Sequence, residues 1–379
     1  MNPISVMHTA DLHLGATLSS LGDFAGSRRA EIVRTFYRML DVCRDEHVSV
    51  LLIAGDFLEA STIRPAMLSD IIRHMAAVPD VQICIAPGNH DFLAPDSPYE
   101  TATWPPNVHI FGPAFSRVAV GDALVVYGAA FTGTYQHTSL LRDVDWRRER
   151  QETEGRVRVL LIHGDWQIRD SAYHPLFPED LPSDFFTYVA LGHVHKRSPL
   201  QQLGRTTLAY PGSPDGAGFD ETGERGVYLG TLLPFETHLT FRPFSSRLLW
   251  RLDADMTDVT GIDEAAKRIL EPMRTPGYAL SDMMARVTLV GDAAEDDPLD
   301  LPLLQKALEE ELTAITLRDR RRVSVDWPTL AREESLRGYF AKALYERYVK
   351  ADDDQKPIVE RALRWGLDTF NGKEVDRAH

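Results

Sequence analysis

Five short polar motifs contain the side chains of this sequence that are best suited to chemistry. Carboxylate, imidazole and amide groups together are typical ligands of divalent metals such as Mn, Fe or Zn, and the lack of thiolates among them argues against a structural zinc site. The groups outnumber the ligands of one tetrahedral ion, so we expect two ions that share one carboxylate. Two neighbouring ions can activate a water molecule and hold the oxygens of a phosphoryl group during in-line displacement. The motifs are Asp11-Leu12-His13, Gly55-Asp56, Gly88-Asn89-His90-Asp91, a single His163 and Gly192-His193-Val194-His195.

Each motif alone has a simpler explanation. A lone Asp-x-His is weak evidence, and a Gly-Asp after a strand is often only a turn. An isolated His163 is more often a hydrogen-bonded histidine than a ligand. The ordered set carries the prediction, because Gly-Asn-His-Asp and Gly-His-x-His are much rarer patterns. The small residues Gly55, Gly88 and Gly192 would allow tight turns and a close approach of backbone to the metals.

Each motif follows an apolar run that has the composition of a buried strand: ISVMHTA, VSVLLIA, VQICIAP, VRVLLI and YVAL. Residues 24–46 have apolar side chains three and four positions apart, which predicts a helix, and residues 64–77 follow that spacing less cleanly. Strands that alternate with helices indicate a parallel sheet. Because ligands bind beyond the carboxyl ends of such strands, the motifs are expected to meet in one cleft.

The pattern of apolar residues and turns changes in the rest of the chain. Residues 108–243 contain short β-like runs between Gly and Pro turns, and we expect a second, mixed sheet packed against the first. Further on, the pattern is helical at 262–274 and 300–313, extended at 283–290 and 313–325, and almost wholly helical after 327. The predicted domains are residues 1–245, 246–326 and 327–379.

Composition narrows the class of protein. A chain of 379 residues with 44% apolar and 26% charged side chains is globular, and long enough for two or three domains. Its net charge of −15 argues against a protein that coats nucleic acid by bulk attraction, although a local basic groove stays open. Cys43 and Cys84 are expected to be buried thiols. The N-terminus does not resemble a signal peptide and no run is long enough to span a membrane, so we expect a cytoplasmic protein.

The ordered motifs resemble those of calcineurin-like metallophosphoesterases. Within that superfamily the sequence is most similar to SbcD-type DNA repair exonuclease subunits, which include the YhaO branch and the MRE-eleven nucleases. The closer likeness rests on HTADLHLG at 8–15 and on YPGSPDGAGFDETGERGVYL at 210–229. The resemblance implies a four-layer αββα sandwich, followed by a small α/β cap domain and a helical tail. It covers about residues 5–230, whereas the cap and tail match in layout only.

The resemblance also implies roles for the motif residues. Asp56 would bridge the two ions, and Mn(II) is the metal that the family prefers. His90 would be no ligand but would face the scissile phosphate, stabilising the transition state or protonating the leaving oxygen. Asp91 either orients His90 or only caps the turn. The first ion would be held by Asp11, His13, Asp56 and His195, and the second by Asp56, Asn89, His163 and His193.

One position departs from the family pattern. Glu59 stands where many phosphoesterases have Asp and some of the nucleases have His. A carboxylate there is still able to hydrogen-bond His90, but a direct contact from this position to a DNA sugar is in doubt.

The tail offers two further hypotheses. Between residues 318 and 350, nine Lys or Arg stand against five Asp or Glu, so Arg318, Arg320, Arg321 and Arg322 are candidate contacts to DNA phosphates. The alternative is an exposed strand with a solvated basic edge. Family members bind a long coiled-coil ATPase through C-terminal helices, so an SbcC/YhaN-like ATPase is the expected partner of residues 335–370. Equally, these helices pack only on each other or on the core. A homodimer through residues 24–46 and 64–77 is a further family-based candidate.

The predicted function is metal-dependent hydrolysis of DNA phosphodiesters, as exonuclease and also as endonuclease, in repair or end processing. One alternative is a phosphodiesterase of the same superfamily that acts on small or cyclic nucleotides. The other is a non-catalytic scaffold with a structural metal site.

Overall fold

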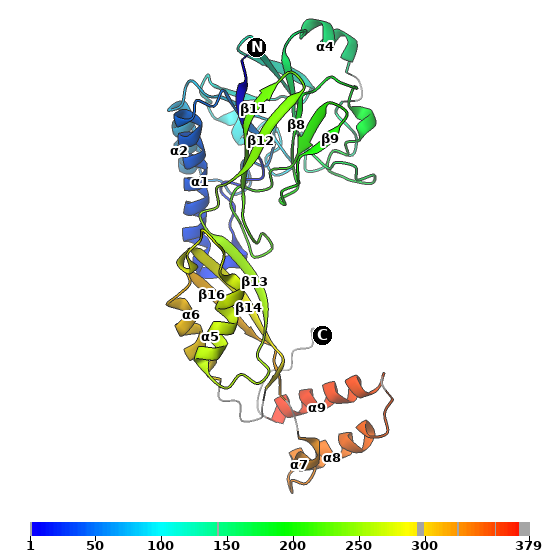
Figure 1. Cartoon of the computed structure of the whole chain (residues 1–379). Helices are drawn as coiled ribbons and strands as arrows, with labels where there is room; N and C mark the ends of the chain where they lie inside the picture. Colours follow the sequence, from blue (N-terminus) through cyan, green and yellow to red (C-terminus); the bar gives the residue numbers. More distant parts are fainter. Residues whose placement is uncertain (1, 142–143, 294–298, 324–325, 353, 371–379) are drawn as a thin grey trace. The chain divides into compact units, whose positions relative to one another are not determined.

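The computed structural model describes residues 2–141, 144–293, 299–323, 326–352 and 354–370, with only the backbone of residues 322, 323, 364 and 368. The chain divides into two compact units (Figure 1). The first comprises residues 1–250 and 282–284, and the second comprises residues 251–281 and 285–379. The predicted domain boundaries at residues 245 and 326 stay predictions. The division into two units does not separate the helical tail from the rest of the second unit.

Six strands form the first sheet of the first unit, in the order β12-β11-β1-β2-β3-β4. Strands β1 to β4 are parallel, and β11 is antiparallel to both of its neighbours. The parallel strands are apolar without alternation, as in VLLI of β2, because both faces of the sheet are covered. The bounds are β1 Ile4–Thr9, β2 Val50–Ile53, β3 Gln82–Ile85, β4 Val108–Ile110, β11 Gly226–Leu233 and β12 Glu236–Pro243.

The second sheet also has six strands, in the order β5-β6-β7-β8-β10-β9. Its four inner strands are parallel, and the edge strands β5 and β9 are antiparallel to their neighbours. The bounds are β5 Ser116–Val120, β6 Leu124–Gly128, β7 Val157–His163, β8 Tyr188–Gly192, β9 Gln201–Leu203 and β10 Thr206–Ala209.

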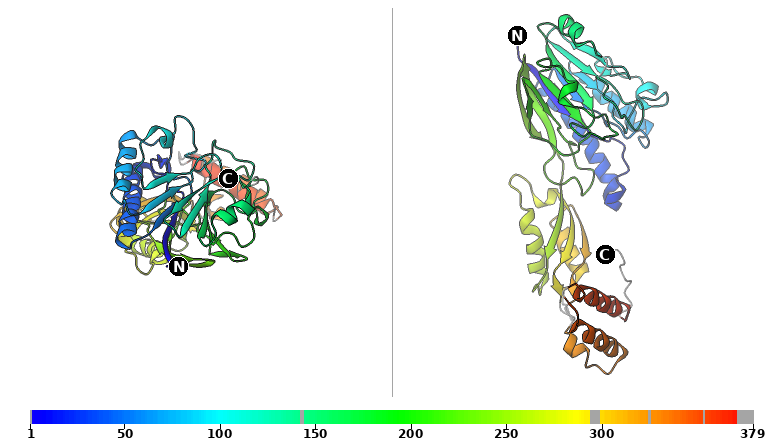
Figure 2. Two further views of the ribbon diagram at one scale, coloured as in Figure 1. Left: turned by 90° about the horizontal axis from the view of Figure 1, so that it is seen from above. Right: turned by 90° about the vertical axis from the view of Figure 1, so that its right-hand side faces the viewer.

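The two sheets pack face to face. Side chains of both sheets, such as Leu52 of β2 and Leu161 of β7, belong to one fully buried cluster. Helices α1 (Ala25–Asp45) and α2 (Pro65–Ala76) cover the outer face of the first sheet, while α4 (Trp146–Glu152) and nearby aromatic rings cover the second. This arrangement is the predicted four-layer α/β sandwich (Figure 2).

The assignment of residues 108–243 to the second sheet was partly wrong. Strands β4, β11 and β12 belong to the first sheet, where Met7 of β1 pairs with Leu229 of β11. Period-two patterning identifies a strand but not its partner, and this pairing joins residues far apart in the chain. The short edge strands β5 and β9 were not predicted, because their exposed faces leave little apolar signal.

The second unit begins with a three-stranded sheet, in the order β13-β14-β16, and two helices. The predicted order of helix, strand, helix and strand is present, whereas β13 was not predicted. The bounds are β13 Leu248–Asp255, α5 Ile262–Leu270, β14 Met283–Val290, β15 Asp292–Ala293, α6 Leu301–Glu309, β16 Ala314–Asp319 and β17 Arg322–Val323. The remaining short helices of the described chain are η1 Ser19–Phe24, α3 Pro98–Thr101, η2 Pro178–Asp180, η3 Glu271–Met273 and η4 Leu280–Asp282.

Three helices follow, α7 (Trp327–Leu330), α8 (Leu336–Tyr348) and α9 (Lys356–Phe370). Their buried side chains are Leu330, Ala341 and Leu363, with Phe340 and Leu344 packed against them. Two large apolar side chains of α8 lie outside this core, because Leu336 and Tyr339 are 74% and 66% exposed. Small residues of α8, Gly338 and Ala341, face inward instead.

Both cysteines are buried free thiols. Among the described residues, no helix combines the length and the apolar character needed to cross a membrane.

Candidate metal centre

The five predicted motifs lie at or directly after the carboxyl ends of β1, β2, β3, β7 and β8. Hydrogen bonds between the first two loops extend the β1–β2 pairing: Asp11 N–H donates to Gly55 C=O at 3.1 Å, and His13 N–H donates to Asp56 C=O at 2.9 Å. Asp11, His13 and Asp56 have φ angles of 54°, 45° and 47°. Such left-handed backbone is uncommon outside glycine and is enriched at functional sites.

Glycines allow these loops to approach one another closely. A Cβ atom on Gly88 would lie 2.3 Å from Oδ1 of Asp56, and one on Gly192 would lie 1.7 Å from the carbonyl oxygen of Ala54. Neither position has room for a side chain, so glycine is required at both.

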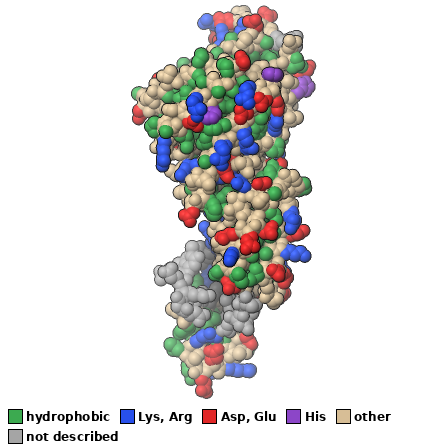
Figure 3. Space-filling model, turned by 90° about the vertical axis from the view of Figure 1, so that its left-hand side faces the viewer, with side chains coloured by type: hydrophobic (Ala, Val, Ile, Leu, Met, Phe, Trp, Pro, Cys, Tyr) green, Lys and Arg blue, Asp and Glu red, His purple; other side chains and the backbone are tan. Residues whose placement is uncertain are grey.

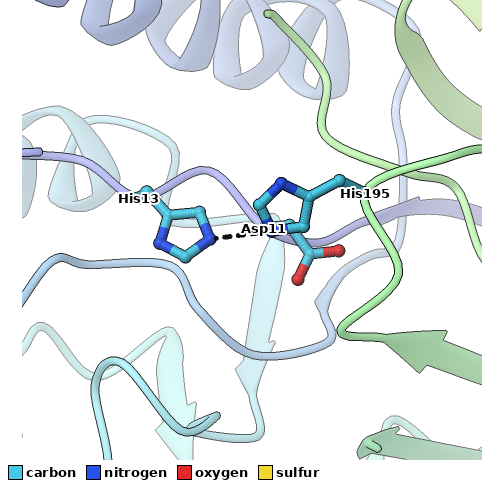
Figure 4. A group of neighbouring side chains, drawn as sticks. All are labelled: Asp11, His13 and His195. Carbon is cyan, nitrogen blue, oxygen red and sulfur yellow. Dashed lines mark hydrogen bonds between the residues drawn. The ribbon is translucent and has the colours of Figure 1, made fainter. Parts of the chain in front are cut away.

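Asp11, His13 and His195 form the first group of predicted ligands (Figure 4). One ligand atom of each lies within 4.8 Å of the other two. The Nε2 atoms of His13 and His195 are 3.2 Å apart. Asp11 is held in place by the backbone N–H of His193, which donates to Oδ1 at 3.0 Å.

Asp56, His163 and His193 form the second group, again with ligand atoms within 4.8 Å of one another. Asn89 joins them, because its Oδ1 lies 3.0 Å from Nε2 of His163. Asp56 also lies 3.7 Å from Nε2 of His13, between the two groups. The structure therefore brings all seven predicted ligand side chains together, with Asp56 in the central position predicted for the bridge.

The hydrogen bonds of His163 fit a cation at this point. Its Nδ1–H donates to the carbonyl oxygen of Ala54 at 2.9 Å, so the neutral ring presents a lone pair at Nε2. That atom faces Oδ1 of Asn89 at 3.0 Å and Oδ2 of Asp56 at 3.4 Å. Three acceptor atoms thus converge, and either a proton on Nε2 or a metal ion satisfies them. Metal-ligating histidines commonly have such a backbone carbonyl partner at the other nitrogen.

The titration behaviour of the group reflects the same convergence. Burial alone would lower the pKa of His163, but the charge and hydrogen bond of Asp56, together with the charge of Asp11, outweigh burial and raise that pKa to about 9. Burial works against ionisation of Asp56 as well, yet the neighbouring His163 lowers its pKa. Burial and the charge of His163 together lower the pKa of His193 to about 4. Positive charge is therefore favoured at the point nearest Asp56.

His90 lies at the edge of the site, with its side chain 46% exposed. Its Nδ1 donates to Oε2 of Glu59 at 2.9 Å, which raises the pKa of His90. Glu59 Oε2 also lies 3.5 Å from Nδ1 of His13. Although burial opposes it, hydrogen bonds from the two histidines lower the pKa of Glu59 to about 2. His90 also forms a third possible ligand group with His13 and Asp56.

Asp91 contacts backbone N–H groups and a tyrosine rather than His90. Its carboxylate accepts hydrogen bonds from the N–H groups of Phe57, Leu58 and Gly88, at 2.8, 3.1 and 2.7 Å, and from Tyr99 Oη at 2.6 Å. The ring of His90 is not among these partners in the described chain. Of the two alternatives for Asp91, these contacts favour the structural one, and Glu59 supplies the carboxylate that contacts His90.

Glu221 is a site residue that the sequence did not reveal. It is only 5% exposed, and its Oε1 accepts a hydrogen bond from Nδ1 of His195. Its Oε2 accepts from the backbone N–H of Ala217 at 2.7 Å. Burial opposes protonation of His195, but this bond, together with the charges of Asp11 and Glu221, raises its pKa to about 9. The only signal was the Phe-Asp-Glu stretch at 219–221, where nothing local pointed to His195.

The four arginines proposed for DNA contact differ in their surroundings. Arg318 and Arg320 are exposed at the end of β16. Arg321 forms a two-pronged hydrogen bond with the carboxylate of Asp319, at 2.9 and 3.0 Å, so its guanidinium already has an anionic partner. The side chain of Arg322 lies outside the described part of the chain. Contact of these residues with DNA stays a prediction.

Comparisons with known proteins agree with this geometry. The sequence pattern of the family described as calcineurin-like phosphoesterase matches residues 4–197. The chain is 26% identical over 356 residues to an uncharacterized metallophosphoesterase, YhaO of Bacillus subtilis, an alignment that covers 88% of this chain and 83% of that protein.

Two archaeal proteins named DNA double-strand break repair protein Mre11 are similar over a shorter region. The protein from Saccharolobus solfataricus is 26% identical over 56% of this chain and 55% of its own length. The one from Methanopyrus kandleri is 26% identical over 58% of this chain and 51% of its own length. The chain thus spans about half the length of these Mre11 relatives.

Proposed function

Because residues 4–197 carry the family pattern, the chain belongs to the calcineurin-like phosphoesterases, a family of metal-dependent hydrolases, and we propose that it is a nuclease that hydrolyses DNA phosphodiesters. One observation carries the proposal: side chains from five loops converge on two neighbouring ligand groups, with Asp56 of the second group 3.7 Å from His13 of the first. The names of the Mre11 relatives support DNA as the substrate.

The proposed ligands of the first ion are Asp11, His13, Asp56 and His195, and those of the second are Asp56, Asn89, His163 and His193. The mixture of carboxylate, imidazole and amide suits Mn(II), which we propose as the metal. Two such ions, when bound, supply water activation and neutralise charge on the phosphate. The protein positions them through the shared loops, the required glycines and the hydrogen bonds of the ligands.

His90 is proposed to act on the substrate itself. Glu59 accepts a hydrogen bond from Nδ1 of His90, which raises the pKa of His90, favours the protonated ring and directs Nε2 away from Glu59. A protonated Nε2 is able to stabilise a phosphate oxygen or to give its proton to the leaving oxygen. The His90→Ala variant should keep its metal content and lose roughly 10²- to 10⁴-fold in turnover. Wild-type turnover in this variant would exclude the role.

Charge over the surface does not by itself favour DNA. The net charge is −15, and acidic and basic side chains are interspersed on the face in Figure 3. A nuclease of this charge needs local contacts to phosphates instead. The exposed Arg318 and Arg320 are proposed as two of them. Replacing either with Gln should weaken binding to all DNA sequences alike and reduce the salt dependence of binding.

A comparison of three substrates with Mn(II) tests the proposal. We expect cleavage of labelled DNA and of bis-p-nitrophenyl phosphate, with cyclic nucleotides cut poorly. Rapid hydrolysis of cyclic nucleotides without cleavage of DNA would instead identify a small-molecule phosphodiesterase. Full metal occupancy without cleavage of any substrate would identify a scaffold.

We also propose that a coiled-coil ATPase of the SbcC/YhaN type binds the helices after residue 327. Apolar side chains support this, since Leu336, Tyr339 and Ile358 on α8 and α9 are 74%, 66% and 67% exposed. Large exposed apolar groups are typical anchors of helix-mediated interfaces. The Leu336→Glu/Tyr339→Glu double variant should no longer co-purify with such an ATPase from the native cell, while it keeps nuclease activity on short DNA. Unchanged co-purification would contradict the proposal.

A homodimer through α1 and α2 is a further proposal, which sedimentation of the purified chain would test.

A further inference from the structure

A row of aromatic rings leads outward from the second ligand group. The ring of Tyr173 lies 4.7 Å from that of His193, with the planes tilted by 33°. Tyr135 follows at 5.8 Å from Tyr173, and His137 at 6.1 Å from Tyr135. We infer that Tyr135 and Tyr173 form a stacking platform for an unpaired base of single-stranded DNA next to the scissile phosphate. The inference rests on the proposed nuclease function and specifies its substrate.

The platform is built from two loops that are bonded to each other. The loop after β6 carries Tyr135, and the loop after β7 carries Tyr173. The backbone N–H of Gln136 donates to Ala172 C=O at 2.8 Å, and the N–H of His174 donates to Gln136 C=O at 2.6 Å. These bonds lie next to both tyrosines in the chain and hold the two loops together.

A buried histidine secures the base of the platform. The Nδ1 of His174 donates to the carbonyl oxygen of His163, and its Nε2 accepts from the backbone N–H of Leu140, both at 2.9 Å. The loop also passes close to the strand end, because a Cβ on Gly164 would lie 2.5 Å from the carbonyl oxygen of His174. The tyrosines are thus attached to the same framework as the ligand His163, so they are preorganised with respect to the site.

Packing does not account for the ring of Tyr135. Tyr135 is 60% exposed, and Ile168 on the facing loop is 51% exposed. A ring with this exposure contributes little buried area to the core, and most of its surface is accessible to solvent. Single exposed apolar residues are ordinary on protein surfaces, but here the exposed ring continues a row that begins at a predicted metal ligand.

The chemistry of a flat, open tyrosine next to a phosphate site favours a nucleobase. Every base has a π-face, and stacking on an aromatic side chain is tolerant of sequence. A base inside a duplex is already stacked and paired on both sides, so an exposed ring selects a base that is free. Tyr173 is one ring away from His193 and Tyr135 two, which suits the nucleotides that adjoin the scissile bond.

The test uses the full chain and four proteins: wild type, Tyr135→Ala, Tyr135→Trp and a matched control, Tyr339→Ala. The control removes an equally exposed tyrosine from α8. Each protein is assayed for binding and for Mn(II)-dependent cleavage of a short single strand, the same strand with abasic sites, and bis-p-nitrophenyl phosphate.

We expect Tyr135→Ala to weaken binding of the single strand roughly 5- to 150-fold, which corresponds to the loss of one stacked base. Tyr135→Trp should restore binding, and Tyr339→Ala should not change it. On the abasic strand, wild type and Tyr135→Ala should become alike. Hydrolysis of bis-p-nitrophenyl phosphate, which has no base, should be unchanged in all four proteins.

Other outcomes would overturn the inference. If wild type and Tyr135→Ala bound the intact strand equally well, the platform would be excluded. It would also be excluded if Tyr135→Ala lost as much binding to the abasic strand as to the intact strand. Failure of the proposed function is separate: if wild type binds the strand through Tyr135 but cleaves no DNA, the platform stands and the nuclease assignment falls. If wild type neither binds nor cleaves the strand, both fall.

Discussion

Replacing Glu221 with Gln should weaken the binding of one metal ion and leave the other nearly unchanged. The carboxylate accepts two N–H groups, from Nδ1 of His195 on one oxygen and from the backbone of Ala217 on the other. A carboxamide of the same size has one oxygen and one NH2 group. In the Gln variant, either His195 Nδ1–H or the Ala217 N–H must therefore face the side-chain NH2 group, which is itself a donor.

The consequence for His195 sets the magnitude. If its Nδ1–H loses the acceptor, the proton is able to move to Nε2, the atom that faces His13 in the first ligand group. Loss of such outer partners typically reduces metal affinity by about 10- to 100-fold, or about 1.4 to 2.7 kcal/mol. The second group should be spared, because His163 is held by Ala54 instead.

Calorimetric titration with Mn(II) measures both affinities. Glu236→Gln is the matched control, since that carboxylate is 65% exposed on β12 and contacts only His238 among the ion pairs of the described chain. A thermal unfolding midpoint close to that of wild type would show that Glu221→Gln is folded. Two ions bound with wild-type affinity by the folded variant would refute the reasoning.

Three further predictions concern single residues. The Asp56→Ala variant should lose both ions together, which elemental analysis of the purified protein measures; retention of one tightly bound ion would exclude the bridge. Asp215→Ala should lower the free energy of unfolding by about 1.5–3 kcal/mol in urea titrations, because the buried guanidinium of Arg28 loses one of its two carboxylate partners and keeps only Glu31; a loss below about 1 kcal/mol would show that the Arg28–Asp215 pair contributes little. His8 is buried against Tyr188, and burial lowers its pKa to about 3, so the stability it contributes is present above pH 6.5 and is lost as the pH falls toward 3. Between pH 7 and pH 5 the metal-free wild type should lose about 2 kcal/mol more than His8→Gln, and parallel losses would contradict this.

The strand-and-loop pattern was sufficient to predict which side chains converge at the candidate metal centre. Apolar runs ending in Asp11, Asp56 and His163 placed those residues at strand ends, and strand ends of parallel sheets meet in space. The required closeness of Gly88 and Gly192 followed from the same argument. These signals are local in the chain, so they can be detected in a single sequence.

The failures share a different cause, since each depends on contacts between distant segments. Nothing near Glu221 shows that it meets His195, and no pattern shows that β11 returns to pair with β1. In the helical tail, the spacing of apolar residues did not show which of them are buried. Close packing places Ala341 inside and leaves Tyr339 in solvent. Asp91 was ambiguous in the sequence, and only its backbone partners decided between the two interpretations.

The left-handed backbone of Asp11, His13 and Asp56 has an evolutionary consequence. Held conformations of this kind are tolerated where the surrounding structure compensates for them, and glycine would relieve the strain at no steric expense. A descendant that stopped using metal would be free to drift toward glycine or asparagine at these three places and become more stable. Aspartate and histidine retained at these three positions would therefore distinguish related proteins that still use metal from those that have lost it.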